Sequence, residues 1–452
     1  MAQVRALPFR EEPRYTRAQT SDVSIYPVPD TSPQSATSTP IRRLSLPEFV
    51  ALTAMLMALN ALAIDIMLPA LPAMGAEFKV PTENDRQLII VSYMLGFGIS
   101  QLFYGPLTDR FGRRPVLFIS LFFYVVAAIM CVYAPSFDLL IAARAFMGAS
   151  AGGSRVIAVS AARDLYSGRQ MAKVMSLVMI VFMSAPIVAP FFGQLMLKVM
   201  TWHGIFWVLA VFGVVMLVWV LVRMPETLPP ERRVPLNLPT MFGNYWKVIR
   251  TREALGYTIA SGFLFGGLMS YISSSEQLYH EVYDTGDWFA LWFAGAAVAM
   301  SVSNLINSRL VERIGMRPIS HFALICFVIV SIVHAVIALQ GPVPFPLFYT
   351  LVILAFFCIG FQGPNYNAIA MEPLGALAGS GAALIGFASS FVSASIGGLV
   401  ARQFDGTVTP IFIGHAVVGV LALITIFITE RGKLMQTHNA PGQGPPPAQG
   451  RA

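Results

Sequence analysis

Charged residues are scarce in this 452-residue chain. They make up 12% of it, whereas hydrophobic residues make up 56%. A soluble domain carries roughly 25% charged residues. The composition therefore excludes an ordinary soluble protein and favours one that crosses a membrane many times.

Residues with catalytic or metal-binding chemistry are also few. The three cysteines all lie in apolar runs, without CxxC spacing, so neither a disulfide framework nor a cysteine zinc site is expected. The six histidines show no metal or triad spacing, and no Walker sequence is present. We expect no cofactor, no metal and no enzymatic activity. A membrane enzyme would need such a cluster. A membrane sensor without transport or catalysis is a further class that the composition leaves open.

Long apolar runs predict an all-α membrane protein, because helices pair their backbone groups internally in lipid. The runs predict twelve spans at 47–70, 87–105, 115–134, 138–160, 172–197, 203–223, 254–275, 287–306, 319–339, 345–369, 377–401 and 408–429. The first apolar run begins too far into the chain, and is too long, to be a cleavable signal peptide.

Basic residues are distributed unevenly between the two sides. Of the 30 Lys and Arg residues, 24 fall on the side of the two termini and 4 on the other. This bias places both termini in the cytoplasm. The net charge of +7 then reflects orientation, and we expect a lipid bilayer rather than a nucleic acid as partner.

A short charged segment occurs twice. Residues 107–115 and 310–318 share Leu, Arg, Gly, Arg and Pro, with an acid at Asp109 or Glu312. The repeat predicts two pseudo-symmetric six-helix bundles, 47–223 and 253–430, joined by a cytoplasmic loop, 224–252. The Ser/Thr/Pro-rich residues 1–46 and the tail 431–452 are predicted to be disordered cytoplasmic segments.

The first copy of this segment is predicted to form a tight turn between two antiparallel spans. Gly105 and Gly112 would permit the turn, and Pro115 suits a first helical turn. Asp109 is expected just before the third span, near its N-terminus.

Several segments together resemble one family. The loop 105–115 is similar to motif A of the major facilitator superfamily, and residues 64–72 (IDIMLPALP) resemble the first-span signature of its drug:H⁺ antiporter branch. Further similar segments are 144–148 (RAFMG), 163–166 (RDLY), 202–207 (WHGIFW) and 363–368 (GPNYNA). The twelve-span pattern resembles the Bcr/CflA multidrug-efflux group over residues 47–430.

The resemblance implies proton-coupled efflux of small amphipathic compounds across the inner (plasma) membrane by alternating access. It also implies a cytoplasmic gate, with Gly105, Asp109, Arg110, Gly112, Arg113, Arg163 and Asp164 as candidates. Generic loop charges are the alternative reading of that set. A uniporter, or an importer of one metabolite, is the alternative function. We expect a monomer, because the cavity forms within one chain.

The fifth span departs from the family pattern. Motif C usually runs Gly-Pro-x-x-Gly-Gly, whereas residues 189–194 read APFFGQ. Pro186 and Pro190 each remove a backbone donor and can bend the helix, with Gly193 after them. A packing kink and a bend that seals the cavity against protons are both compatible with this segment.

Two charges are predicted at similar depth inside the membrane, Asp65 in the first span and Arg144 in the fourth. A charge at the bilayer centre costs roughly 2.5–3.5 kcal/mol on insertion scales, so the two are natural partners. We expect Asp65 to be the proton-responsive group, since a carboxylate can lose its charge and Arg cannot. A fixed structural ion pair is the alternative.

Other polar residues within the spans are candidates for the substrate cavity. Arg155 lies three helical turns after Arg144, on nearly the same face, and would bind an anionic substrate group or else extend toward the interface. Gln101, Asn304, Gln362 and Asn365 would line the cavity or form interhelical hydrogen bonds. Glu276, at the outer end of its span, is either a second titrating acid or part of a solvated acidic loop, and the acids at 281, 284 and 287 favour the loop.

Overall fold

The computed structural model describes residues 44–436, and within that range the protein is helical, without a strand. The N-terminal set of helices is α1 (Leu46–Asp65), α2 (Leu71–Glu77), α3 (Leu88–Phe111), α4 (Arg113–Val132), α5 (Phe137–Leu165), α6 (Gly168–Leu197) and α7 (Trp202–Arg223). The C-terminal set is α9 (Arg252–Gln277), α10 (Phe289–Ile314), α11 (Met316–Gln340), α12 (Phe345–Met371), α13 (Ala378–Ala401) and α14 (Thr409–Thr429). Between the sets lies α8 (Leu238–Arg250).

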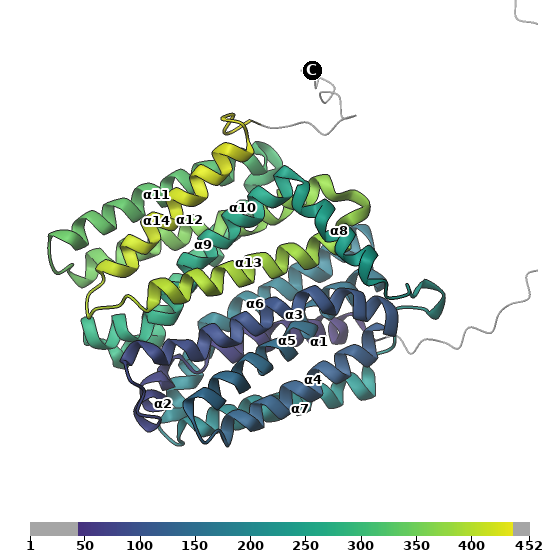
Figure 1. The fold of residues 1–452 in the computed structure, drawn as a ribbon, viewed down its shortest axis with the longest axis horizontal. Helices are drawn as coiled ribbons and strands as arrows, with labels where there is room; N and C mark the ends of the chain where they lie inside the picture. The colour runs from purple at the N-terminus through teal and green to yellow at the C-terminus, as the bar shows by residue number, and fades with distance from the viewer. Residues whose placement is uncertain (1–43, 437–452) are drawn as a thin grey trace, which may run out of the picture. The chain divides into compact units, whose positions relative to one another are not determined.

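The two sets pack mainly within themselves. In the first, α5 lies against α1, α3 and α4, and α4 packs on α7; in the second, α9 lies against α12, α13 and α14. The sets meet along two seams, α3 with α13 and α6 with α10. The groups can be followed by colour in Figure 1. The predicted all-α fold with two six-helix bundles is confirmed.

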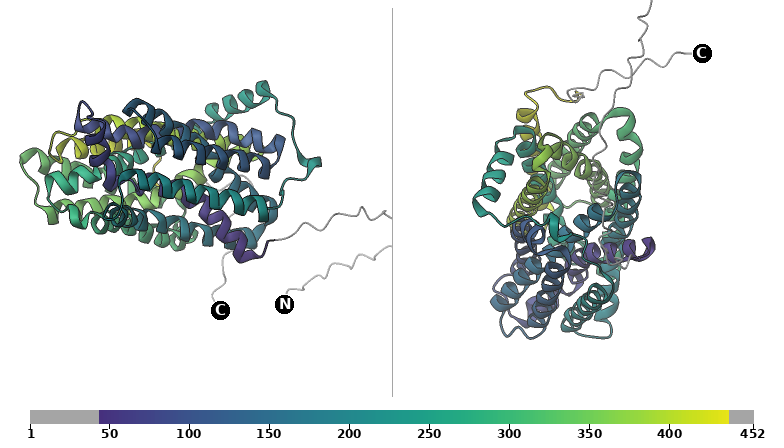
Figure 2. Two further views of the ribbon diagram at one scale, coloured as in Figure 1. Left: turned by 90° about the horizontal axis from the view of Figure 1, so that it is seen from below. Right: turned by 90° about the vertical axis from the view of Figure 1, so that its right-hand side faces the viewer.

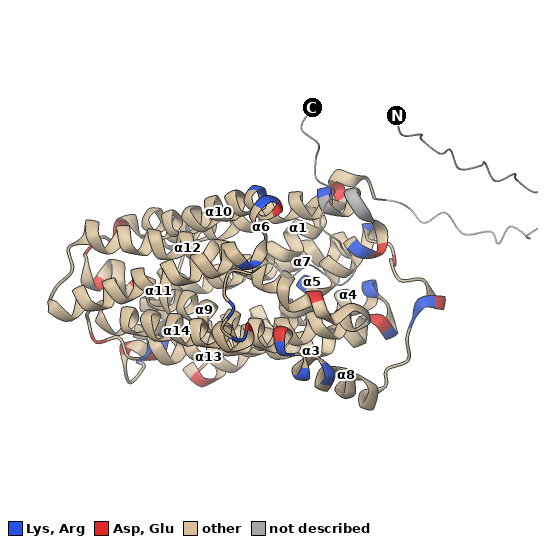
Figure 3. Ribbon diagram, turned by 90° about the horizontal axis from the view of Figure 1, so that it is seen from above, with Lys and Arg blue, Asp and Glu red and all other residues tan. Residues whose placement is uncertain are grey.

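The helices connect at two opposite ends, as the views in Figure 2 show. We call the end where α1 begins and α14 finishes the terminal end. The end that carries the connections 78–87, 278–288 and 402–408 is the loop end. Charged residues gather near these ends, and long uncharged stretches lie between them (Figure 3).

Eleven helices in the described chain are long and apolar enough to cross a membrane, close to the twelve spans predicted. The helix outside this count is α5, which carries Arg144 and Arg155. Neighbouring helices cover α5, so its length need not be uniformly apolar.

The predicted first span, 47–70, lies within the membrane candidate Leu46–Glu77 but is not one continuous helix. The helix α1 stops at Asp65, and a short 3-10 turn, Leu68–Ala70, leads into α2. Pro69 explains the break, because its ring would clash with the carbonyl group of residue 65, four positions earlier. The other predicted spans match helices whose ends differ by a few residues, and α3, α5 and α10 run further than predicted.

A single glycine joins the helices in each copy of the repeated segment. Gly112 (φ +96°) lies between α3 and α4, and Gly315 (φ +91°) lies between α10 and α11. Gly105 is not part of the turn, since α3 continues through it to Phe111. Asp109 accordingly lies in the last turn of α3 and not before the next helix, which corrects the prediction.

The connection 224–252, predicted as a loop, contains the unpredicted helix α8. Its prolines favoured a loop, but Pro239 lies in the first turn of the helix, where a missing N–H costs nothing. The predicted tails, 1–46 and 431–452, lie mostly outside the described residues.

Candidate functional site

Asp65 lies at the break of α1. It is the last residue of that helix and only 4% exposed. Within residues 44–436, its carboxylate has no hydrogen-bond or ion-pair partner. An ionised Asp65 would therefore be a buried charge without a counter-ion, at the negative end of the α1 dipole.

The helix α6 packs directly against this break. A Cβ atom added to Gly193 would lie 2.1 Å from the carbonyl oxygen of Ile66, so only glycine allows the approach. Pro186 and Pro190 lie inside α6, which stays one helix through both. Residues 189–194, which depart from the family motif, thus retain a glycine where the backbone of α6 meets the break of α1.

Arg144 is fully buried on α5 and connects three helices. Its Nε donates to the carbonyl oxygen of Ile89 (3.1 Å), and its Nη2 donates to that of Ala63 (3.1 Å). The guanidinium also lies 4.4 Å from the ring centroid of Tyr93. Ala63 is in the last turn of α1, so Arg144 caps the C-terminus of that helix.

The predicted ion pair between Asp65 and Arg144 is not formed. Both residues lie near the end of α1, as the depth argument required, but Arg144 binds the backbone two residues before Asp65. Residues two apart on a helix point in directions roughly 200° apart. Depth along a span can be read from the sequence, whereas direction around it depends on helix rotation.

Arg155 is exposed, and its guanidinium lies 6.0 Å from the ring of Phe97 on α3. In the part of the chain that the structure describes, it has no ion-pair partner. Arg144 and Arg155 both lie against α3, consistent with their spacing along α5. Arg155 is thus a cation on a membrane helix that remains available to a ligand.

Three of the four uncharged cavity candidates form contacts between helices. The Gln101 amide donates to the carbonyl oxygen of Gly386 (3.3 Å) and to Ser390 Oγ (3.2 Å) across the α3–α13 seam. Asn304 contacts Met183 Sδ across the α6–α10 seam. Asn365 exchanges hydrogen bonds with Asn307 inside the C-terminal set.

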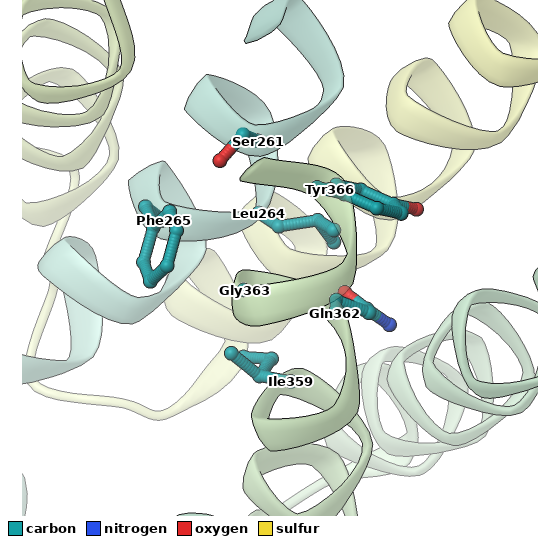
Figure 4. Close-up of a pocket in the computed structure, with 7 residues that line it drawn as sticks. All are labelled: Ser261, Leu264, Phe265, Ile359, Gln362, Gly363 and Tyr366. Atoms are coloured by element: carbon teal, nitrogen blue, oxygen red, sulfur yellow. The ribbon is translucent and has the colours of Figure 1, made fainter. Parts of the chain in front are cut away.

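Gln362 differs from these three. It is 1% exposed, and both polar atoms of its amide lack a hydrogen-bond partner among the described residues. Tyr366, one turn later on α12, has an unpartnered hydroxyl. Both residues line a small cavity between α9 and α12, and their polar ends point to the same side of α12 (Figure 4). In this conformation the cavity is too small for a water molecule, so these buried polar atoms stay without partners.

Three residues of the predicted gate, Asp109, Arg113 and Asp164, form a cluster at the terminal end. Arg113 donates to Asp109 (2.6 Å) and to Asp164 (3.0 Å). Glu226, in the connection after α7, accepts from the backbone N–H groups of Arg113 and Arg114. Arg110 and Arg163 are exposed and have no ion-pair partner in residues 44–436.

The second copy forms a similar cluster with a different arginine. Arg317 donates to Glu372 (3.1 Å) and Glu430 (3.1 Å). Arg113 immediately follows its linking glycine, whereas Arg317 is the second residue after its own. Each cluster stays within its own half of the molecule.

The halves are instead joined at the loop end. Arg86 forms an ion pair with Glu276 (3.2 Å) and contacts Glu281, and Arg402 pairs with Asp85 (3.1 Å). Glu276 is 6% exposed, so its interpretation as a solvated loop acid is wrong.

Amides extend this connection between the halves. The Gln87 amide donates to Gln277 Oε1 (2.5 Å), and the Asn84 amide donates to the carbonyl oxygen of Phe404 (2.7 Å). Sequence analysis missed this network. One signal in the sequence could have indicated it. Arg86 is one of four basic residues predicted on this side, and the acids at 276–287 are predicted on the same side.

Comparison with known proteins agrees with this architecture. A family model described as the Major Facilitator Superfamily matches residues 53–398. An uncharacterized MFS-type transporter, YdgK of Bacillus subtilis (strain 168), is 31% identical over 381 residues, which cover 82% of this chain and 93% of the relative.

Two further relatives carry names that refer to drug resistance. The bicyclomycin resistance protein homolog of Haemophilus influenzae is 30% identical over 391 residues, covering 85% of this chain and 96% of the relative. Multidrug resistance protein D of Escherichia coli (strain K12) is 28% identical over 342 residues, covering 74% and 83%. The predicted resemblance to the Bcr/CflA group is confirmed.

Among solved structures, the crystal structure of the human organic anion transporter MFSD10 (TETRAN) is similar. Its TM-score is 0.63 at 18% sequence identity, and the match covers 85% of this chain and 100% of that one. At this identity the similarity concerns the fold alone.

Proposed function

Because the chain belongs to the major facilitator superfamily and is a membrane transporter, not an enzyme, we propose that it exports small amphipathic compounds in exchange for protons. The observation that carries this proposal is Asp65, a buried carboxylate without a partner at the break of a membrane helix. Relatives named for bicyclomycin and multidrug resistance support drug-like substrates.

Asp65 acts as the proton-binding group. Protonation removes both the cost of a buried charge and its unfavourable position at the C-terminus of α1. A substrate that requires the ionised form, or that occupies the space near the break, displaces the proton. Such competition couples the substrate flux to the proton flux, provided that the substrate and the proton favour different conformations. Arg144 contributes by fixing the end of α1 beside Asp65.

Residues 47–223 and 253–430 move as two units about a central site. The network at the loop end joins the units in this structure. All hydrogen bonds and ion pairs found between the two sets in the described chain lie at that end or in the middle of the seams. The structure thus corresponds to a state closed at the loop end. The terminal end faces the cytoplasm, and the membrane is the inner membrane.

Arg155, Gln362 and Tyr366 are the proposed substrate contacts, because each offers a polar group without a protein partner. Gln101, Asn304 and Asn365 hold helices together and act indirectly. The Arg113–Asp109–Asp164 cluster, supported by Glu226, belongs to the cytoplasmic gate and rearranges when that end closes. A single chain is the transporting unit.

The test uses purified protein in liposomes with an imposed pH gradient. Wild type is expected to accumulate a lipophilic cation or dye against its gradient and to move protons in the opposite direction. Asp65→Asn should retain binding and lose ΔpH-driven transport, whereas Asp65→Glu should retain part of it. Asp138→Asn is the matched control, since Asp138 is exposed at the start of α5.

A susceptibility panel in a pump-deficient host, at equal membrane expression, gives the cellular readout. Resistance that survives Asp65→Asn would remove Asp65 from the mechanism. Substrate movement that ignores ΔpH in wild type would instead support a uniporter. Accumulation in the direction of the proton flux would identify an importer.

A further inference from the structure

The helix α8 has an exposed apolar stripe that no part of the described chain covers. Leu238, Phe242 and Trp246 lie one turn apart on one side of the helix, and they are 51%, 60% and 55% exposed. An exposed stripe of this size and aromatic content marks an interaction surface.

The neighbouring side of α8, roughly 100° around the helix from the stripe, packs on the protein. Met241, Tyr245 and Val248 are buried, and the Tyr245 hydroxyl donates to the carbonyl oxygen of Leu102 on α3 (2.7 Å). Met241 and Tyr245 also form an apolar cluster with Ala383 at the start of α13. The helix therefore rests on the α3–α13 seam, where the two halves of the transporter meet.

Basic residues lie beside the exposed stripe. Lys247 and Arg250 are exposed, and the helical period places them on the side of the stripe away from the buried face. The Arg250 guanidinium lies 4.9 Å from the Trp246 ring centroid. Neither basic residue has an acidic partner in residues 44–436.

The position of α8 identifies what covers the stripe. The helix ends at Arg250, and the membrane helix α9 begins at Arg252, so α8 lies where the chain enters the bilayer. Figure 1 shows α8 running steeply across the direction of α9 and α13. A helix that crosses the end of the spans in this way would lie along the membrane surface, where Trp residues and basic side chains are favoured.

We propose that the outer face of α8 binds anionic phospholipid. The side chains of Leu238, Phe242 and Trp246 insert among the acyl chains, while Lys247 and Arg250 contact phosphate-bearing headgroups. The inner face transmits this binding to the α3–α13 seam. The proposal goes beyond transport and does not depend on proton coupling or on substrate identity.

Binding can be measured on the full chain after delipidation, by titration with phosphatidylglycerol or phosphatidylcholine. We expect phosphatidylglycerol to bind more tightly to wild type. Each basic residue near an anionic surface contributes about 1 kcal/mol, so Lys247→Gln/Arg250→Gln should weaken this binding by roughly tenfold or more. The control is Lys79→Gln/Lys198→Gln, which removes two exposed lysines near the loop end. Equal binding of both lipids, or unchanged binding by the α8 variant, would overturn the charge assignment.

The depth of the stripe is a second, independent measurement. A spin label at position 242, in a variant with the three native cysteines replaced, should be accessible to oxygen and shielded from a water-soluble nickel complex. A label at position 247 should show the reverse. A water-accessible label at position 242 in anionic nanodiscs would refute membrane docking, and would assign the stripe to a soluble partner.

Discussion

The contact between Gly193 and Ile66 gives a sharp test of how the proposed proton site at Asp65 is built. A Cβ atom at position 193 would lie 2.1 Å from the Ile66 carbonyl oxygen, next to Asp65. Ordinary contacts of this kind are longer than 3.0 Å, so α6 and the break of α1 must separate by about 1 Å. Forced overpacking of this kind costs roughly 1–3 kcal/mol. Gly193→Ala should therefore lower the thermal unfolding midpoint and impair ΔpH-driven transport together.

A matched control exists on α13. A Cβ atom at Gly379 meets nothing within 4 Å, so Gly379→Ala should be neutral or stabilising by up to about 1 kcal/mol through helix propensity. Both variants are compared in nanodiscs at equal expression. Wild-type stability and transport in Gly193→Ala would refute the packing of α6 against the break, and with it the environment assigned to Asp65.

Three further predictions test other parts of the structure. Arg144→Lys should cost about 1–3 kcal/mol of stability, since it replaces the planar guanidinium, whose Nε and Nη2 are fixed toward Ile89 and Ala63, with a single nitrogen on a flexible side chain; unchanged unfolding in nanodiscs would contradict the capping role. Burial opposes ionisation of Glu430, but hydrogen bonds from Tyr257 and Arg317 outweigh it and hold the pKa of this carboxyl below its usual value. The stabilisation that Glu430 contributes should then be complete above its unfolded pKa, roughly 4.3, and should be lost as the pH falls through its lower folded pKa. Glu430→Gln should remove that part of the acid dependence of stability. The double variant Asn84→Cys/Phe404→Cys can be cross-linked with a short bis-maleimide that carries a cleavable linker. The cross-linked form should not transport, and cleavage of the linker should restore transport. Full transport in the cross-linked form would exclude opening at the loop end.

The fold could be predicted because membrane helices leave a strong signal. Apolar runs of spanning length and the repeat at 107–115 and 310–318 fix the number and order of the spans within one helix. The failures share a physical cause. The break at Asp65 and the helical course of α3 through Gly105 depend on local backbone geometry, which hydropathy does not report. The helix α8 was missed because its apolar residues are divided between two faces, one for the protein and one exposed.

The site was only partly predictable. Asp65 and Arg144 were identified because a charge within an apolar run is rare, but their partners depend on helix rotation. Gln101 and Gln362 look alike in sequence, yet one bridges the two halves and the other has no partner. The Arg86–Glu276 pair joins residues 190 positions apart, and no periodicity connects them. Polar residues in a bundle acquire their roles from the neighbouring helix.

The absence of an Asp65–Arg144 pair in this structure bears directly on the proposed proton coupling. A carboxylate held against a guanidinium would resist protonation, because the proton would have to replace a strong ion pair. Here two backbone carbonyl oxygens and an aromatic ring stabilise the Arg144 charge without an acid. Asp65 is therefore free to change its charge without disturbing the packing of α1, α3 and α5. The Arg144 cation already has backbone acceptors, whereas Asp65 has no partner among the described residues, so protonation stabilises Asp65 alone. We expect this arrangement to respond to a change in proton concentration more readily than an ion pair would.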